Sequence, residues 1–295
     1  VSLNLPYIAA EAFNGHKDFF EVLDKYAKIA HKAHQTRLKR ICNTSIDCAP
    51  LLWRDGVFAR CKEENAKIGD IIKPEYASIS LGYAGLYEMT RIQGFENHWE
   101  GEGKEFAMSV MDKLNEYCKE WTLEDKVRYG VYGTPMESGT LKFAKAIKSI
   151  YPKYDRLYVT NSYHIPVFID IDPFTKLKLE GEFQHKSKNG CISYIEAADL
   201  RNNLKAIHQI QMQIFESCMY AEINIKSCKC YTCGSEKPQL IDDNLTWYCQ
   251  DCGENNPNKL RHLYRICGYA STNDANDGRT SDVKDRVTHL DNHEV

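Results

Sequence analysis

Four cysteines near the end of the chain have the spacing of metal ligands. Two C-x-x-C pairs, Cys230 with Cys233 and Cys249 with Cys252, are separated by fifteen residues. Each C-x-x-C turn directs two thiolates towards one point, and two such turns complete the tetrahedron that Zn²⁺ prefers. A redox-active or incidental cluster of cysteines is the alternative. The spacing therefore predicts a zinc ribbon, in which the ion holds structure and does no chemistry.

The overall composition limits the class of protein. The chain has 295 residues, of which 43% are hydrophobic and 27% charged, as in a globular protein with a real core. Its 38 basic and 41 acidic side chains give a formal net charge of −3, which argues against broad electrostatic binding of nucleic acid or membrane. No apolar run approaches the roughly 18–20 residues of a membrane helix. The first residues do not show a basic segment followed by an apolar one, so we expect no signal peptide. We therefore expect a cytoplasmic protein without a disulfide framework, despite its 12 cysteines.

Helical and strand-like segments alternate along the chain, which is typical of an α/β architecture. The residue pattern predicts helices over residues 14–40, 103–121, 139–150 and 202–219. It predicts a strand over residues 155–165, where β-branched and aromatic residues gather. Residues 77–86 are predicted to be a strand or tight turn that leads into a helix through Arg91. The tail after Asn273 is polar and rich in Asp and Asn.

The segment Gly133-Thr-Pro-Met-Glu-Ser138 is predicted to be a turn that opens the helix at residues 139–150. Backbone N–H groups at a helix start carry partial positive charge and suit a phosphate group. The hydroxyl groups of Thr134 and Ser138 add two further donors. Simple capping of the helix by Ser138 is the alternative, and it can coexist with phosphate binding.

After the second cysteine pair the chain reads Arg265-Ile-Cys-Gly-Tyr269, followed by Asp277-Gly-Arg-Thr and Arg286-Val-Thr-His-Leu290. This resembles the glycyl-radical segment of anaerobic (class III) ribonucleotide reductases, where R-[VI]-C-G-Y stands just before the C-terminus. A four-cysteine ribbon directly before that segment is similar to the same family. Four further motifs resemble the family and follow its order along the chain: Ser2-Leu-Asn-Leu-Pro6, Ser80-Leu-Gly-Tyr83, Tyr132-Gly-Thr-Pro-Met-Glu-Ser138 and Thr160-Asn-Ser-Tyr-His-Ile-Pro166.

The resemblance implies that Gly268 carries a radical. Glycine is suited to this role because its α-carbon has no side chain and can flatten between an electron-donating nitrogen and an electron-withdrawing carbonyl. A turn is the ordinary role of a lone glycine and is the alternative. The resemblance also implies that the four cysteines hold a structural zinc ion, which anchors the radical loop close to its partner thiol and away from oxygen.

The resemblance implies a substrate loop as well. Thr134, Pro135, Met136 and Ser138 match the loop that holds the phosphates of a ribonucleoside triphosphate. Glu137 is then placed to orient a ribose hydroxyl or exchange protons with it, although a surface glutamate is nearly as common a role.

Two further residues lie in family motifs. Asn4 matches the asparagine of L-N-L-P and is expected to contact the sugar, with a buried asparagine at a strand end as the alternative. His164 belongs to a segment that resembles a pocket-lining strand end. We expect it to be a structural histidine rather than a catalytic one.

The implied fold is α/β, the C-terminal part of a ten-stranded α/β barrel of the glycyl-radical enzyme type. We expect residues 1–222 to form the partial barrel, 223–258 the zinc ribbon, and 259–295 the glycyl-radical loop and tail. The family's thiyl cysteine lies shortly before L-N-L-P, a position that falls before Val1, and none of the 12 cysteines replaces it in family order. We therefore expect a C-terminal part of a longer reductase, inactive by itself.

The implied activity is anaerobic reduction of ribonucleoside triphosphates to deoxyribonucleoside triphosphates, which supplies DNA replication, in an enzyme that also binds ATP. A radical-SAM activating enzyme, with a [4Fe–4S] cluster and S-adenosylmethionine, would install the radical on Gly268. Formate is the expected reductant, with a dithiol route as the alternative, and the family commonly forms homodimers.

Two other classes of protein stay open. One is another glycyl-radical enzyme, such as a formate-lyase relative, against which the ribbon and the phosphate-type loop argue. The other is a zinc-ribbon binding module in which the R-I-C-G-Y match is accidental. The residues between the two cysteine pairs are not basic, which weakens a role in nucleic-acid binding.

Overall fold

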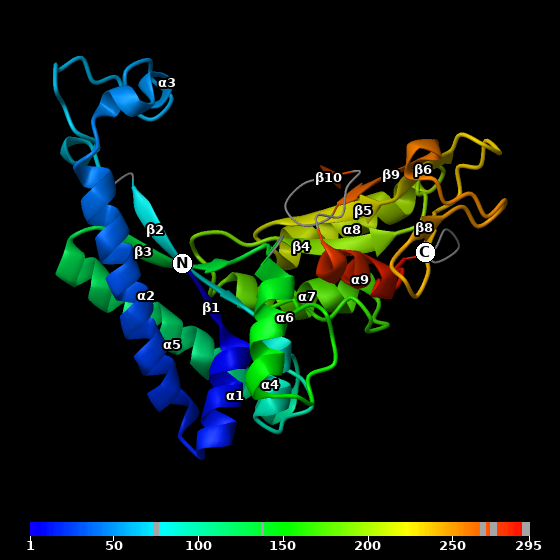
Figure 1. The fold of residues 1–295 in the computed structure, drawn as a ribbon, viewed down its shortest axis with the longest axis horizontal. Coiled ribbons are helices and arrows are strands. Elements are labelled where there is room, and N and C mark those ends of the chain that lie inside the picture. The colour runs from blue at the N-terminus through cyan, green and yellow to red at the C-terminus, as the bar shows by residue number, and fades with distance from the viewer. Residues whose placement is uncertain (73–76, 137–138, 266–269, 272–275, 291–295) are drawn as a thin grey trace.

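The computed structural model describes residues 1–72, 77–136, 139–265, 270–271 and 276–290. In its first half, helices pack around a three-stranded parallel sheet (Figure 1). Its second half holds a two-stranded parallel sheet, a ribbon of short antiparallel strands, and a last helix. Helices and strands alternate through most of the chain, which confirms the predicted α/β class.

The strands of the first sheet lie in the order β1 (Ser2–Asn4), β2 (Ser78–Ala84) and β3 (Arg128–Gly133). Leu3 pairs with Tyr83, and Leu81 pairs with Val131, and all four side chains are buried. Parallel neighbours need long crossovers, and here these are helical. The helices around this sheet are α1 (Leu5–Gly15) and α2 (Phe19–Cys42) before β2, α4 (Leu86–Ile92) and α5 (Gly101–Asp125) before β3, and α6 (Gly139–Ile150) after it.

Capping side chains decide where the first two helices begin. The Asn4 side chain accepts a hydrogen bond from the Tyr7 N–H at 3.2 Å, and the Asp18 carboxylate accepts two backbone N–H groups at 2.9 and 3.1 Å. Between them, His16 adopts a left-handed conformation with φ 50° and ends α1. The single helix predicted over residues 14–40 is therefore wrong at its start, because α1 and α2 are separate helices.

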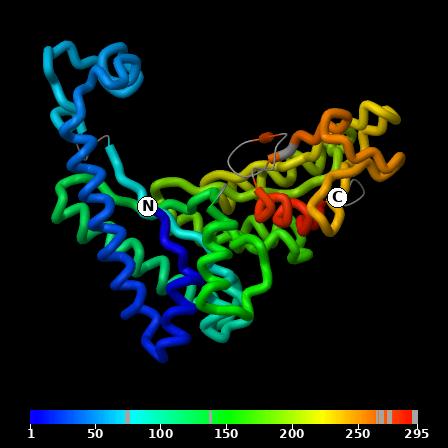
Figure 2. The backbone as a smooth tube through the Cα atoms, viewed as in Figure 1, coloured from blue at the N-terminus to red at the C-terminus, as the bar shows by residue number. Residues whose placement is uncertain are grey.

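Other predicted elements of this half are confirmed. The helix predicted over residues 103–121 is α5, and the helix at residues 139–150 is α6 with the same bounds. Residues 77–86 form β2 and lead into α4. Residues 43–72 form an arm beyond the end of α2 (Figure 2), with the short helix α3 (Pro50–Trp53), 3₁₀ turns at Ile46–Cys48 and Ile68–Asp70, and a small core of Ile46, Ala66 and Ile68.

The second parallel sheet pairs β4 (Ser193–Ala197) with β5 (Ala221–Ile225). Helix α7 (Pro173–Gln184) precedes β4, and α8 (Leu204–Ser217) joins the two strands, close to the helix predicted over residues 202–219. Their apolar side chains share one core, to which Leu290 of the tail contributes. Ala197 also makes a parallel bridge with Leu290, so the end of the chain is attached to this sheet.

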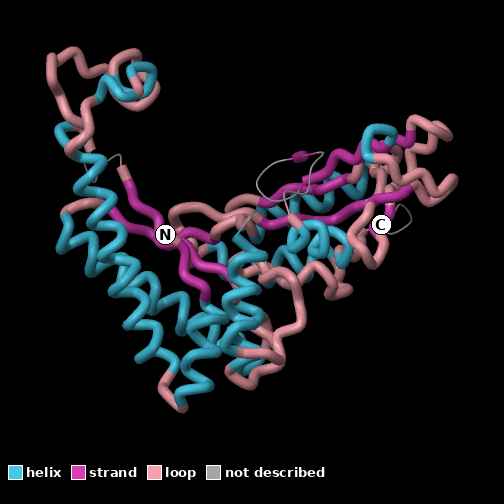
Figure 3. The backbone as a smooth tube through the Cα atoms, in the orientation of Figure 1, coloured by secondary structure: helices cyan, strands magenta, loops and turns pink. Residues whose placement is uncertain are grey.

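The ribbon consists of short antiparallel strands and much loop (Figure 3). Strand β9 (Leu260–Arg265) lies between β6 (Ser227–Cys230) and β10 (Ala270–Ser271), and β7 (Leu240–Ile241) pairs with β8 (Trp247–Tyr248). A 3₁₀ turn at Pro257–Lys259 precedes β9. Helix α9 (Asp277–Asp285) follows and packs on α6 (Figure 1). The polar tail thus contains a helix that the sequence pattern did not predict.

The strand predicted over residues 155–165 is wrong, because this segment has no regular secondary structure. Buried side chains take the place of strand neighbours. The N–H of Thr160 donates to Glu88 at 2.8 Å, and the N–H of Ile165 donates to Glu180 at 2.9 Å. The Nε2 atom of His98 lies 2.7 Å from the carbonyl oxygen of Tyr163. Residues 158–165 are buried, and two carboxylates and an imidazole bond to backbone groups there that a strand would pair with a neighbouring backbone.

Among the described residues, no helix is both long enough and apolar enough to cross a membrane.

The first sheet leaves no room for a side chain at Gly82. A Cβ at this position would lie 2.2 Å from the Thr134 hydroxyl oxygen and 2.4 Å from that of Ser2. We expect Gly82→Ala to lower the free energy of unfolding by about 1–3 kcal/mol because the Ser2 and Thr134 side chains must be displaced and lose their mutual contact. Gly15→Ala is the control, since a Cβ there meets only the Lys17 side chain at 3.6 Å or more. Urea titrations followed by circular dichroism measure both variants, and equal stabilities would contradict the packing described.

Candidate functional site

The two cysteine pairs predicted to bind a metal come together in the ribbon. The thiol sulfurs of Cys230, Cys233, Cys249 and Cys252 all lie within 4.8 Å of one another. Cys230 and Cys252 are 3.7 Å apart, as are Cys233 and Cys249. A tetrahedral zinc ion with bonds of about 2.3 Å places its sulfurs about 3.8 Å apart. The four side chains therefore fit a zinc ion.

The two turns have the same backbone geometry. The N–H of Gly234 donates to the carbonyl of Cys230, and the N–H of Gly253 donates to that of Cys249, each at 2.9 Å. Both glycines have positive φ, 80° and 72°, which explains why glycine follows each pair. Backbone N–H groups of Cys233 and Thr232 point at the Cys230 sulfur and lower its pKa to about 7. This favours one thiolate in the cluster, whereas the neighbouring cysteines raise the pKa values of Cys233 and Cys252, so a metal ion must displace their protons.

The loop predicted to hold phosphates follows β3 at the edge where the parallel strands end. Thr134 and Pro135 are half-buried, and Met136 is buried. The Thr134 hydroxyl lies 3.1 Å from the Ser2 hydroxyl of β1. The N–H of Met136 donates to the Asn161 side chain at 3.2 Å, and the carbonyl of Met136 accepts from Arg279. Both backbone polar groups of Met136 therefore already have protein partners.

Two predicted members of this loop, Glu137 and Ser138, lie outside the described residues, and so does Gly268. The nearest described residues on the two sides of Gly268 are Arg265 and Ala270. Arg265, at the end of β9, pairs with Ala270 of β10.

Asn4 uses its amide for structure. Its oxygen caps α1, and its nitrogen donates to the carbonyl of Phe143 in α6 at 3.3 Å. The side chain thus links the end of β1 to α6, the helix that the predicted phosphate loop opens. The contact of Asn4 with a sugar stays a prediction.

His164 is buried, and its Nε2 lies 2.7 Å from the carbonyl oxygen of Ile192. Burial lowers the pKa of His164 below its usual value, so the ring is neutral at pH 7. A ring with a fixed backbone partner is what a structural histidine requires.

The sequence reasoning missed a set of buried charges around α9. Arg279 and Asp282 of this helix are buried, as are Arg286 after it and Glu196 of β4. The tail was predicted from its Asp and Asn content to be polar, and α9 has few apolar residues to signal burial. The motif Asp277-Gly-Arg-Thr was the one available sign of Arg279.

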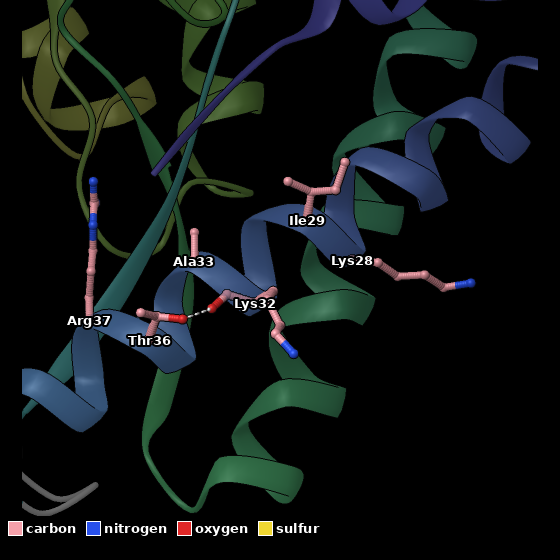
Figure 4. Close-up of a pocket in the computed structure, with 6 residues that line it drawn as sticks. All are labelled: Lys28, Ile29, Lys32, Ala33, Thr36 and Arg37. Carbon is pink, nitrogen blue, oxygen red and sulfur yellow. Dashed lines mark hydrogen bonds between the residues drawn. The ribbon is translucent and has the colours of Figure 1, made fainter.

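A wide hollow on the outer face of α2 contains none of the predicted site residues. It has a volume of about 570 Å³ and is lined by Lys28, Ile29, Lys32, Ala33, Thr36 and Arg37. Figure 4 shows the three cationic side chains pointing in different directions rather than towards a common point. The Thr36 hydroxyl donates to the carbonyl of Lys32 at 2.8 Å, within the helix itself. This face offers no converging donors for a small ligand.

Relatives of known identity match almost the whole chain. One of them, the anaerobic ribonucleoside-triphosphate reductase of Haemophilus influenzae, is 32% identical over 299 residues. Enzymes of the same name from Enterobacteria phage T4 and Escherichia coli are 28% and 29% identical. The matches cover 98–100% of this chain but only 42–48% of these relatives, so the chain spans less than half their length.

Solved structures show the same fold. The anaerobic ribonucleotide reductase from Thermotoga maritima, solved in complex with dATP and CTP, matches with a TM-score of 0.65 at 18% identity. The match covers 92% of this chain and 42% of that one. The family described as anaerobic ribonucleoside-triphosphate reductase matches residues 1–289, which include the cysteine pairs, the substrate-loop motif and the R-I-C-G-Y segment. The chain therefore belongs to the anaerobic ribonucleoside-triphosphate reductase family.

Proposed function

We propose that this chain takes part in the anaerobic reduction of ribonucleoside triphosphates to deoxyribonucleoside triphosphates by a glycyl/thiyl radical mechanism. The observation that carries this proposal is the family match over residues 1–289, which runs unbroken through the substrate-loop motif, the ribbon and the R-I-C-G-Y segment.

Gly268 is the residue proposed to hold the radical, installed by a radical-SAM activating enzyme. From there the radical passes to a cysteine thiol, which takes the 3′-hydrogen of the ribose. The 2′-hydroxyl then leaves as water, and formate supplies the reducing electrons. A dithiol reductant is the alternative. The part of this chain is to position the substrate and hold the radical segment near it.

Residues 1–222 are proposed to form one wall of an α/β barrel, 223–258 a zinc ribbon, and 259–295 the radical loop and tail. The strand order supports the barrel, because β1, β2 and β3 are parallel, lie in sequence order and are joined by helices. Parallel strands have all their carboxyl ends at one edge, where substrates of such folds bind.

The substrate is proposed to bind at this edge. Asn4 is the last residue of β1, and Thr134 follows the last residue of β3. Thr134, Pro135, Met136 and Ser138 would cradle the phosphates at the start of α6, with Glu137 and Asn4 towards the ribose. The contact between the Thr134 and Ser2 hydroxyls supports this placement, since it brings the L-N-L-P motif next to the loop.

A structural zinc ion is proposed at the four cysteines. Replacing one of these four should abolish zinc binding, whereas replacing a cysteine outside the cluster should not. We expect one zinc ion per chain, lost in Cys249→Ser, because a serine hydroxyl does not ionise near neutral pH. Cys228→Ser is the matched control, since Cys228 is buried in β6 but lies outside the cluster. Mass spectrometry of the dialysed proteins gives the metal content. Equal zinc in both variants would contradict the assignment.

The radical gives the decisive test of function. After anaerobic activation by a radical-SAM enzyme of the family, with the chain complemented by the N-terminal part that its longer relatives carry, we expect an EPR doublet from the α-hydrogen of the glycyl radical. Admitting air should then cut the chain at Gly268 into two pieces, seen by mass spectrometry. Gly268→Ala should show neither, while Gly15→Ala, on α1, should show both. A chain that stays whole and silent after activation would point to a binding module.

A further inference from the structure

Four buried charged side chains form a continuous row of ion pairs, or file, that starts at the proposed substrate loop. Its members are Arg279, Asp282, Arg286 and Glu196. Arg279 of α9 is fully buried. One nitrogen of its guanidinium donates to the carbonyl of Met136, and another donates to the Asp282 carboxylate at 2.8 Å. A side chain of α9 thus contacts the loop at Met136, although α9 and the loop lie far apart in the sequence.

The file continues past Asp282. The Nε atom of Arg286 donates to the other Asp282 oxygen at 3.0 Å. The Nη1 atom of Arg286 reaches two acceptors, the Glu196 carboxylate at 3.1 Å and the carbonyl of Arg265 at 2.7 Å. Arg265 ends β9, three positions before Gly268 in the sequence.

Glu196 and Asn224 secure the far end. Asn224 donates to the two Glu196 oxygens at 2.8 and 2.7 Å. The side-chain oxygen Oδ1 of Asn224 accepts the N–H of Arg265 at 3.0 Å. Both backbone polar groups of Arg265 are therefore held by buried side chains of this network.

The charges of the file alternate in sign. Arg279, Asp282, Arg286 and Glu196 are two cations and two anions. Asp282 lies between the two arginines, and Arg286 lies between the two carboxylates. Leaving a buried charge without its partner is strongly unfavourable, so no member can move away alone. A displacement at Met136 must therefore be accommodated along the whole file, as far as Arg265.

We propose that Arg279 is a positioning residue that couples the loop at Met136 to the backbone at Arg265, so that the two segments hold one relative position. This proposal rests on the proposed function, because that function makes the segment at Met136 the substrate loop and the segment at Arg265 the base of the radical segment. Substrate bound at the loop then restricts the motion of the backbone at Arg265, next to the radical segment. Restricted motion at Arg265 in turn favours substrate binding.

Hydrogen–deuterium exchange of the chain tests the coupling at a distance. Glu196→Gln weakens the file at its far end, where Arg286, Asp282 and Arg279 separate Glu196 from Met136. Arg279→Met breaks the file at the loop. We expect both variants to speed exchange in a peptide spanning residues 130–140 at least fivefold. Arg279→Lys, which keeps the charge but loses the forked contact, should fall between Arg279→Met and the unchanged chain.

Glu11→Gln is the matched control. Glu11 is another partly shielded carboxylate, which accepts from Lys25 at 2.6 Å and from Tyr26 at 2.5 Å between α1 and α2. Its replacement should speed exchange only around these partners. The proposal is overturned if Glu196→Gln leaves the 130–140 peptide unchanged, or if Glu11→Gln speeds that peptide equally. Because this readout needs neither nucleotide nor radical, the coupling can hold even where the EPR experiment fails, and the two failures are distinguishable.

Discussion

Buried polar groups need partners, and in this chain that requirement decides where the irregular segments lie. Thr160 bonds through both its N–H and its hydroxyl to Glu88, whose burial raises its pKa. Glu180 accepts the Ile165 N–H while paired with Lys176 at 2.6 Å. A strand would satisfy these N–H groups from a neighbouring backbone, whereas here helices α4 and α7 do so with side chains. The connection between the two parallel sheets is thereby fixed without being regular.

The same requirement ties the ribbon to the rest of the molecule. The ribbon has a very small apolar core of Cys230, Cys249 and Leu260, with Trp247 against it. So small a core cannot hold strands by itself, and four close thiolates would repel one another without a cation. A metal at the cysteines would therefore give β6 and β9 a fixed geometry. Because Arg265 ends β9, that geometry reaches the file of charges and, through Arg279, the loop at Met136.

What the sequence could predict depended on the kind of signal. The cysteine spacing and the helices α5, α6 and α8 follow local rules of ligand geometry and apolar periodicity, and the structure agrees with them. Residues 155–165 looked like a strand because their side chains are those of a strand, but partners distant in sequence satisfy their backbone. Helix α9 escaped prediction because ion pairs bury it, and its Asp- and Asn-rich composition resembles a solvated tail.

Structural and ligand-binding roles compete for the same atoms at the strand edge. The amide of Asn4 is shared between Tyr7 and Phe143, and both backbone groups of Met136 have partners. A phosphate at this edge would therefore take its hydrogen bonds from the Thr134 hydroxyl and from N–H groups at the start of α6, whereas Met136 would line the cradle with its side chain. Met136 instead fixes the position of the loop relative to α9 through its bond to Arg279. Among the loop residues that the structure describes, the most buried is thus the one whose contribution is to position its neighbours.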